Sequence, residues 1–302
     1  MHSVTCRPDV MNPEPTGLAE RPRSRLTTRV IQRAPRLFFG FVLFSCVACS
    51  DDKYTPKPCT ALFCDDFEAY ADGAAPEGNW QTRARAGTVA VDRTRHHSGS
   101  RSVRAATDAG SGTKTAFLQL GSPVLPLPQN SMFGRFYMYL ESAPETSVHF
   151  TLVQATGTVP GQDYRAQYRY GGQLPVTDSS GFVGSQWLAN YDTPDFYSNK
   201  GPGSDCWHHA KSRVVPTRKW ACIEWEFDGP SSTLRLWQDG EAAEDLTVVE
   251  TGDGCVNAPN QSPWTPPTFD VLELGFESYQ NDDARVLYVD DVAVSDQKIG
   301  CQ

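Results

Sequence analysis

Short runs of alternating apolar and polar residues, separated by turn-forming residues, recur along most of the chain. Successive side chains of a strand point to opposite faces of its sheet, so each run predicts a β-strand. The ten clearest runs are 88–91, 101–105, 115–120, 132–140, 148–155, 164–170, 220–227, 233–238, 271–276 and 286–294. No long segment has the 3.6-residue period of an amphipathic helix. The pattern therefore predicts an all-β fold, a two-sheet antiparallel β-sandwich.

Between the sixth and seventh runs, residues 171–215 lack this alternation and are rich in glycine, serine, aspartate and aromatic residues. We expect long loops here, where binding sites are often found on rigid sandwiches. No repeat or long linker divides the chain after its N-terminal region. We predict one domain over 62–302, preceded by a polar, proline-bearing tether over 49–61.

The first 48 residues have a different character. They carry seven arginines and three acidic residues, a net charge of +4, and end in an apolar run that begins at Leu37. A basic region followed by a short apolar run is typical of a signal peptide. Small residues precede Cys49, which favours lipid attachment there, with Cys46 as the alternative register. We expect an exported protein held to a membrane only by this lipid, as an outer-membrane or cell-surface lipoprotein. The alternative is cleavage without lipid, giving a secreted or periplasmic protein.

The charge of the chain excludes one class of partner, and its cysteines predict disulfides. The 302-residue chain has a net charge of −9, so the part after residue 48 carries −13 and would repel nucleic acid. Six cysteines follow Cys49, at positions 59, 64, 206, 222, 255 and 301, which predicts three disulfides in an exported chain. First and last strands of sandwiches are often neighbours, so we expect Cys64 to pair with Cys301. We also expect a monomer.

Five segments give the chain a family resemblance. They are Cys64–Tyr70, His97–Val103, Trp220–Gly229, Leu236–Gly240 and Tyr288–Val294. In order and spacing they resemble the concanavalin A-like jelly rolls of carbohydrate-active proteins. The match is nearest to the polysaccharide-lyase-like core of the fungal cellulose-induced proteins and their bacterial relatives. The resemblance implies a jelly roll over nearly the whole mature chain and a polysaccharide partner.

The resemblance also implies a structural calcium ion. Its ligands would be Glu68, the turn from Ser98 to Arg101, and Asp290 or Asp291. Calcium accepts six to eight oxygen ligands and tolerates mixtures of carboxylates and carbonyls. The alternative is a solvated acidic cluster at the end of a strand.

The run at 164–170 contains the strongest candidate chemistry. Alternation places Arg165, Gln167 and Arg169 in one row, with tyrosines on the other face. Such a row is either solvated or lines a groove that binds a uronate carboxylate, because guanidinium and carboxylate groups match in shape and charge. A β-eliminating lyase also needs a base. We expect His149 in this role, with Tyr191 and Tyr279 as alternatives.

Other residues suggest other ways of handling sugar. Glu224 and Glu226 share one face of a predicted strand, and a carboxylate pair can hydrolyse glycosides. A solvated strand face is the simpler explanation. Trp187, Tyr191 and other aromatics of the expected loops could stack on sugar rings, or they could close the edges of the sandwich.

Three functions follow from these features. The first is a polysaccharide lyase-like enzyme that acts on uronic-acid-containing glycans by β-elimination. The second is a non-catalytic carbohydrate-binding lipoprotein. The third is a surface protein that uses the jelly roll for protein contacts. The lyase requires the arginine row and His149 to lie on one concave surface. An arginine row that faces open solvent would exclude it.

Overall fold

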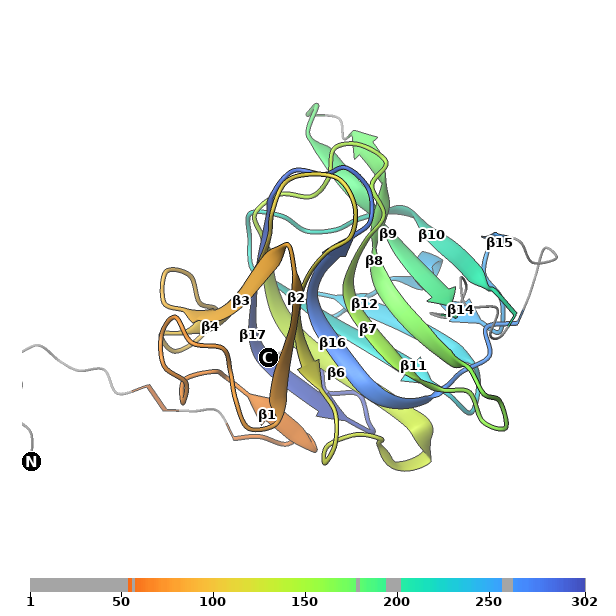
Figure 1. Cartoon of the computed structure of the whole chain (residues 1–302), viewed down its shortest axis with the longest axis horizontal. Helices are drawn as coiled ribbons and strands as arrows, with labels where there is room; N and C mark the ends of the chain where they lie inside the picture. Colours follow the sequence, from red (N-terminus) through yellow and green to blue (C-terminus); the bar gives the residue numbers. More distant parts are fainter. Residues whose placement is uncertain (1–53, 56–57, 178–179, 194–201, 257–262, 302) are drawn as a thin grey trace, which may run out of the picture. The chain divides into compact units, whose positions relative to one another are not determined.

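The computed structural model describes residues 54–55, 58–177, 180–193, 202–256 and 263–301, which fold into two stacked antiparallel β-sheets (Figure 1). Two single-turn 3-10 helices, Pro128–Asn130 and Glu244–Leu246, connect strands. Within these ranges no helix has the length and apolarity needed to cross a membrane. The predicted signal peptide and Cys49 lie outside the described residues.

Sheet A brings the two ends of the domain together. Its strands lie in the order β13 (Glu241–Ala242), β12 (Thr233–Gln238), β11 (Ala221–Asp228), β6 (Ser131–Leu140), β17 (Arg285–Ser295), β4 (Ser102–Thr107) and β3 (Gly87–Asp92). Two short strands complete it, β1 (Phe63–Asp65) beside β17 and β14 (Val248–Val249) beside β12. The first and last strands are therefore neighbours, with Phe63 opposite Val294.

Sheet B carries the long central strands of the domain. Its order is β15 (Gly254–Val256), β10 (Asp205–Val214), β9 (Val183–Asp192), β8 (Arg165–Thr177), β7 (Phe150–Thr158), β16 (Thr268–Ser278), β5 (Lys114–Leu120) and β2 (Trp80–Arg85). Every pairing in both sheets is antiparallel. Figure 1 shows these strands running side by side across the face nearest the viewer.

The core between the sheets is built from the alternate positions that the sequence pattern identified. Trp225 and Phe136 of sheet A pack edge to face at 5.7 Å, and Phe227 of sheet A stacks on Tyr170 of sheet B at 5.7 Å. Such pairs add to the stabilisation from burying apolar area. Gly134 makes room for the indole, because a Cβ there would lie 2.0 Å from the ring of Trp225.

All ten predicted strands are present, but the prediction of long loops over 171–215 is wrong. Strand β8 continues to Thr177, and β9 and β10 fill most of the remainder. The outer face of β9 carries polar Gln186, Asn190 and Asp192, but Leu188 interrupts this row and obscures the alternation. Trp187 and Tyr191 lie in the core, while Leu188 and Asn190, on the other face, are also buried.

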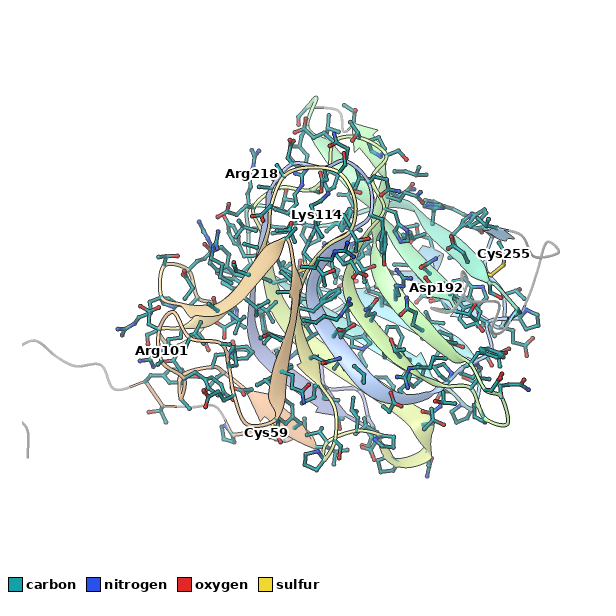
Figure 2. All side chains as sticks on the ribbon, viewed as in Figure 1. Cys59, Arg101, Lys114, Asp192, Arg218 and Cys255 are labelled. Atoms are coloured by element: carbon teal, nitrogen blue, oxygen red, sulfur yellow. A yellow bond between two sulfur atoms is a disulfide. The ribbon has the colours of Figure 1, made fainter. Side chains whose placement is uncertain are left out.

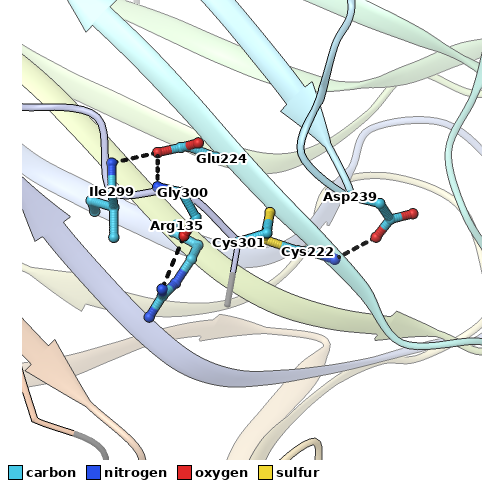
Figure 3. Close-up of a disulfide and its surroundings, with 7 residues drawn as sticks. All are labelled: Arg135, Cys222, Glu224, Asp239, Ile299, Gly300 and Cys301. Atoms are coloured by element: carbon cyan, nitrogen blue, oxygen red, sulfur yellow. Dashed lines mark hydrogen bonds between the residues drawn. A yellow bond between two sulfur atoms is a disulfide. The ribbon is translucent and has the colours of Figure 1, made fainter.

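Three disulfides form among the described cysteines, as expected for an exported protein: Cys59–Cys64, Cys206–Cys255 and Cys222–Cys301. The predicted Cys64–Cys301 pair is wrong. Although β1 and β17 are neighbours, Cys301 lies beyond the end of β17, where the chain has crossed to β11 and Cys222 (Figure 3). Cys64 instead fixes the end of the tether, through Cys59.

Candidate functional site: a polar groove on sheet B

A cavity of about 780 Å³ lies on the face of sheet B that points away from the core. Its principal polar lining consists of Arg83, His149, Gln154, Arg165, Gln167, Arg169, Asp192, Asp205, Glu273, Glu277 and Tyr279. We call this cavity the groove. Figure 2 labels Asp192, which lies at its β9 side, among the side chains of sheet B. Two other cavities have volumes of about 340 and 440 Å³.

The row of polar residues on β8 lines the groove, as the alternation predicted. Arg165, Gln167 and Arg169 face the cavity, whereas Tyr168 and Tyr170 of the same strand are buried in the core. The row is therefore on a concave surface, which was the geometric condition for a substrate-binding role.

Arg169 occupies the centre of the row and is 5% exposed. Its Nη2 forms an ion pair with Asp192, and its Nη1 donates to the Tyr279 hydroxyl at 2.5 Å. Its Nε has no hydrogen-bond partner among the described residues, and the same is true of Oε1 of the neighbouring Gln154. A buried polar atom without a partner costs about 1–3 kcal/mol, and both atoms are covered by neighbouring protein atoms, so a ligand could reach them only after a shift of these side chains.

The other two residues of the row are held less tightly. Arg165 lies at the rim with a 40% exposed side chain, and its guanidinium binds both carboxylate oxygens of Asp270, at 2.5 and 3.0 Å. Gln167 is 8% exposed and accepts a hydrogen bond from Thr156 Oγ1 at 3.3 Å. An exposed ion pair such as Arg165–Asp270 contributes little to stability, which leaves Arg165 available to a ligand.

His149 and Tyr279 meet at one end of the groove, with ring centroids 5.7 Å apart. Burial, together with the positive charge of Arg169 and proximity to His209, lowers the pKa of His149 to about 3. Burial and the Glu277 carboxylate raise the pKa of Tyr279 although Arg169 opposes them. Near neutral pH both groups are uncharged, so one could accept a proton and the other could donate one.

Sequence reasoning missed the acidic side of the groove. Glu273 and Glu277 of β16 are both 4% exposed, and Arg83 of β2 binds them at 2.6 and 3.1 Å. Glu273 lies within a predicted strand, between Leu272 and Leu274, so the alternation signal was present there. All residues of β2 except Trp80 are exposed, on both faces of the strand, and nothing in its pattern predicted a strand at Arg83.

Two of the predicted site residues lie in the core instead of the groove. Trp187 is fully buried and donates its indole N–H to Gln238 at 3.1 Å. Tyr191 is 1% exposed and stacks on Trp264 at 6.0 Å. The prediction that these aromatics are available to sugar rings is wrong because β9, expected as a loop, is a strand whose odd positions face sheet A.

The two predicted glutamates are also far from the groove, on β11 of sheet A. Glu224 is fully buried and accepts the N–H groups of Ile299 and Gly300 at 2.6 and 2.8 Å (Figure 3). Glu226 forms an ion pair with Arg235 at 2.5 Å. The C-terminal segment thus covers Glu224, and the expected solvated strand face is wrong as well, because both glutamates are buried against structural partners.

The residues expected around calcium gather on one turn. Glu68 accepts the N–H groups of Ser100 and Arg101 at 2.6 and 2.7 Å, and Asp290 accepts those of His97 and Ser98 at 2.7 and 3.2 Å. Burial and the adjacent carboxylate of Asp291 raise the pKa of Asp290 to about 8.

These contacts fit a cation only in part. The described residues contain no group of three or more His, Cys, Asp or Glu side chains placed to share a metal ion. A calcium ion here would therefore need carbonyl oxygens of the turn in addition to one or two carboxylates, a mixture that calcium tolerates.

Comparisons with known proteins agree with this architecture. A family model described as polysaccharide-lyase-like, Cip1-like core domain, matches residues 66–297. No curated protein sequence matches the chain. Among solved structures, the cellulose induced protein Cip1 has a TM-score of 0.53 at 22% identity, over 80% of this chain and 100% of that chain.

Two further structures share a weaker likeness. The alginate lyase vAL-1 from Chlorella virus has a TM-score of 0.38 at 13% identity, over 72% of this chain and 93% of that chain. The catalytic domain of a glycoside hydrolase family 131 protein from Coprinopsis cinerea has a TM-score of 0.41 at 16% identity, over 75% and 86%.

The two-sheet sandwich and the family model together place the chain in the polysaccharide-lyase-like class. Within that class, the chain belongs to the family of Cip1-like core domains.

Proposed function

We propose that the protein is a polysaccharide lyase that cleaves uronic-acid-containing glycans by β-elimination in the groove of sheet B. The observation that carries this proposal is convergence. Arg165, Gln167 and Arg169 line the same cavity as His149 and Tyr279. β-Elimination at a uronate needs these two functions in one place, a cation for the carboxylate and a neutral group that moves a proton.

The chemistry assigns a role to each group. The proton at C5 of a uronate becomes acidic enough to remove only when the neighbouring carboxylate is neutralised. Arg169 and Gln167 would bind that carboxylate, and Arg165 would guide the chain at the rim. A base near Arg169, either His149 or Tyr279, takes the proton, the C5–H electrons form the C4–C5 double bond, and the C4–O4 bond breaks.

Ultraviolet absorbance of the unsaturated product tests the proposal directly. We expect absorbance to rise when the folded protein, supplied with calcium, is incubated with glucuronan or alginate. His149→Asn and Tyr279→Phe together should abolish the signal and leave the circular dichroism spectrum unchanged. No signal from the wild-type protein on any uronan would contradict the proposal.

A non-catalytic carbohydrate-binding protein is the second candidate, and one observation favours it. Each groove arginine already has a carboxylate partner, so the groove offers less positive charge than the arginine row suggested. Retention of the protein on immobilised glycan, with no product formed, would support this function. Loss of retention in Gln167→Ala would then place binding in the groove.

We further propose that a calcium ion binds at the 98–101 turn. The buried carboxylate of Asp290 beside Asp291 supports a cation there. A ligand that binds only the folded state at 100 times its Kd stabilises it by about 2.7 kcal/mol. We expect the Tm to fall with EDTA and to return with CaCl2, and Glu68→Gln to weaken the response. A Tm that does not change with either reagent would exclude the site.

Attachment of the chain to a membrane is proposed on the sequence alone. Lipid on Cys49 would hold the domain through the polar tether, part of which Cys59–Cys64 fixes. Incorporation of labelled fatty acid into the wild-type chain, and its loss in Cys49→Ala, would test the anchor. Incorporation that persists in Cys49→Ala and disappears in Cys46→Ala would assign the other register.

A further inference from the structure

The Tyr279 hydroxyl lies between a cation and a carboxylate. Arg169 Nη1 donates to Tyr279 Oη at 2.5 Å, and that hydroxyl donates to Glu277 Oε1 at 2.6 Å. The Tyr279 proton is thus directed at Glu277 and away from the open groove. A lone pair of Oη remains for a proton arriving from the substrate side.

Arg83 and Thr115 keep Glu277 in place on the other side. The second oxygen of Glu277 accepts Thr115 Oγ1 at 2.9 Å and Arg83 Nη1 at 3.1 Å. With Tyr279 on the first oxygen, this carboxylate has a fixed orientation from β2, β5 and the end of β16. An ion pair with Arg83 alone would not need the further hydrogen bonds that Glu277 accepts from Thr115 and Tyr279.

We propose that Glu277 accepts the hydroxyl proton of Tyr279 while Tyr279 removes the C5 proton of the bound uronate. This inference rests on the proposed lyase function. It makes Tyr279 the catalytic base and Glu277 the residue that positions it and receives its proton. His149 then lines the site without being the base.

The step is balanced in protons and electrons. The C5 proton moves to Tyr279 Oη, and the original hydroxyl proton moves to Glu277 Oε1. The C5–H electron pair becomes the C4–C5 double bond, the C4–O4 pair stays on O4, and O4 takes a proton from water. Glu277 later returns its proton to solvent through Tyr279. No oxidant or other co-reactant is needed.

The two arginines act differently on the transfer. Arg169 from β8 stabilises negative charge developing on Tyr279 and so favours loss of its hydroxyl proton, whereas Arg83 from β2 keeps Glu277 ionised and oriented as an acceptor but opposes its protonation. His149, which also borders Tyr279, is a weak base because burial and Arg169 lower its pKa to about 3.

Glu273 provides a matched control for a test of this relay. It has the same 4% exposure as Glu277 and also binds Arg83, but it hydrogen-bonds Gln154 and not Tyr279. Glutamine at either position keeps the shape of the side chain and weakens the contact with Arg83. Only glutamine at 277 removes the proton acceptor behind Tyr279.

The experiment compares steady-state kinetics of Glu277→Gln and Glu273→Gln on the uronan that the wild-type protein cleaves best. We expect kcat of Glu277→Gln to fall about 100-fold or more with KM nearly unchanged, and kcat of Glu273→Gln to fall less than about tenfold. Formate should restore part of kcat in Glu277→Ala, whereas a purely structural loss would not respond to it.

The outcomes separate the relay from the function on which it rests. A wild-type protein that forms no unsaturated product on any uronan contradicts the proposed function. An active wild type with equal losses in the two glutamine variants, and no rescue by formate, overturns the relay alone. Full activity in Glu277→Gln, with loss in His149→Asn, would assign the base to His149.

Discussion

Two charged strand faces, one on β8 and one on β11, have the same pattern in the sequence and different surroundings in the fold. On β8, Arg165, Gln167 and Arg169 line a cavity of about 780 Å³. On β11, Glu224 is sealed beneath the C-terminal segment, and Glu226 is paired with Arg235. Alternation therefore shows that a strand has a polar face, but it does not show what lies above that face.

The difference comes from segments distant in the sequence. Cys222–Cys301 ties the C-terminus across β11, and Arg135 Nη1 donates to the carbonyl oxygen of Gly300 at 3.1 Å (Figure 3). No described segment covers the β8 row in this way, and its neighbours β7, β9 and β16 add further polar side chains. Each face holds a buried polar atom without a hydrogen-bond partner, Arg169 Nε on β8 and Glu224 Oε2 on β11, but only the β8 row borders the groove.

The largest expected effect tests this contrast through activity. Arg169→Met should lower kcat/KM on a uronan about 1,000-fold, which corresponds to about 4 kcal/mol of transition-state stabilisation. Glu224→Gln, on the covered face, should change kcat/KM less than about twofold. The double variant Arg169→Met/Asp192→Asn controls for the carboxylate left unpaired, since it should regain stability without activity. Equal activity losses at positions 169 and 224 would break the contrast.

The strand pattern made the fold largely predictable, because ten strands have one covered face and one polar face. The same reasoning failed at β9. Leu188 interrupts the polar row of Gln186, Asn190 and Asp192 on the groove side of β9, so the alternation is obscured. We therefore expected Trp187 and Tyr191 in loops, although both belong to the core.

The candidate site was predictable only in part, for a related reason. The row on β8 and the groups His149 and Tyr279 could be proposed because each has suitable chemistry by itself. Their approach to one another depends on the register of β7, β8 and β16, which no local pattern gives. Arg83 comes from β2, the edge strand of sheet B. It is separated from its partner Glu277 by 194 residues of sequence.

The next largest effect is the difference in stability, about 2.5 kcal/mol, between losing the disulfide on the covered face and losing Cys59–Cys64. In the chain-entropy model, closing a loop of 79 residues is worth about 4.5 kcal/mol, against about 2 kcal/mol for the loop of five residues at Cys59–Cys64. Cys222→Ser/Cys301→Ser should therefore lower the free energy of unfolding more than Cys59→Ser/Cys64→Ser does. Urea denaturation measures both.

The activity of the folded Cys222→Ser/Cys301→Ser variant, measured below its unfolding transition, adds to the same test. Because the groove lies on the other sheet, kcat/KM of Cys222→Ser/Cys301→Ser should stay near the wild-type value. A large loss of activity in the folded double variant would show that the C-terminal segment supports the groove, and the two faces could no longer be treated as independent.

The smallest expected effect is the pH dependence of stability that the groove contributes through His149. Burial and the charge of Arg169 lower its pKa from 6.5 to about 3. Between these values the unfolded chain binds a proton that the folded protein does not, so stability falls as the pH drops below 6.5. The loss at about pH 5 should be about 1–2 kcal/mol, with allowance for the partial exposure of the ring.

Urea denaturation of wild type and His149→Gln should show a smaller acid loss in the variant, while His209 titrates alike in both. Arg169→Met should also reduce the loss, because it removes the charge that opposes protonation of His149. An identical pH dependence in all three proteins would mean that His149 is not held neutral by the groove.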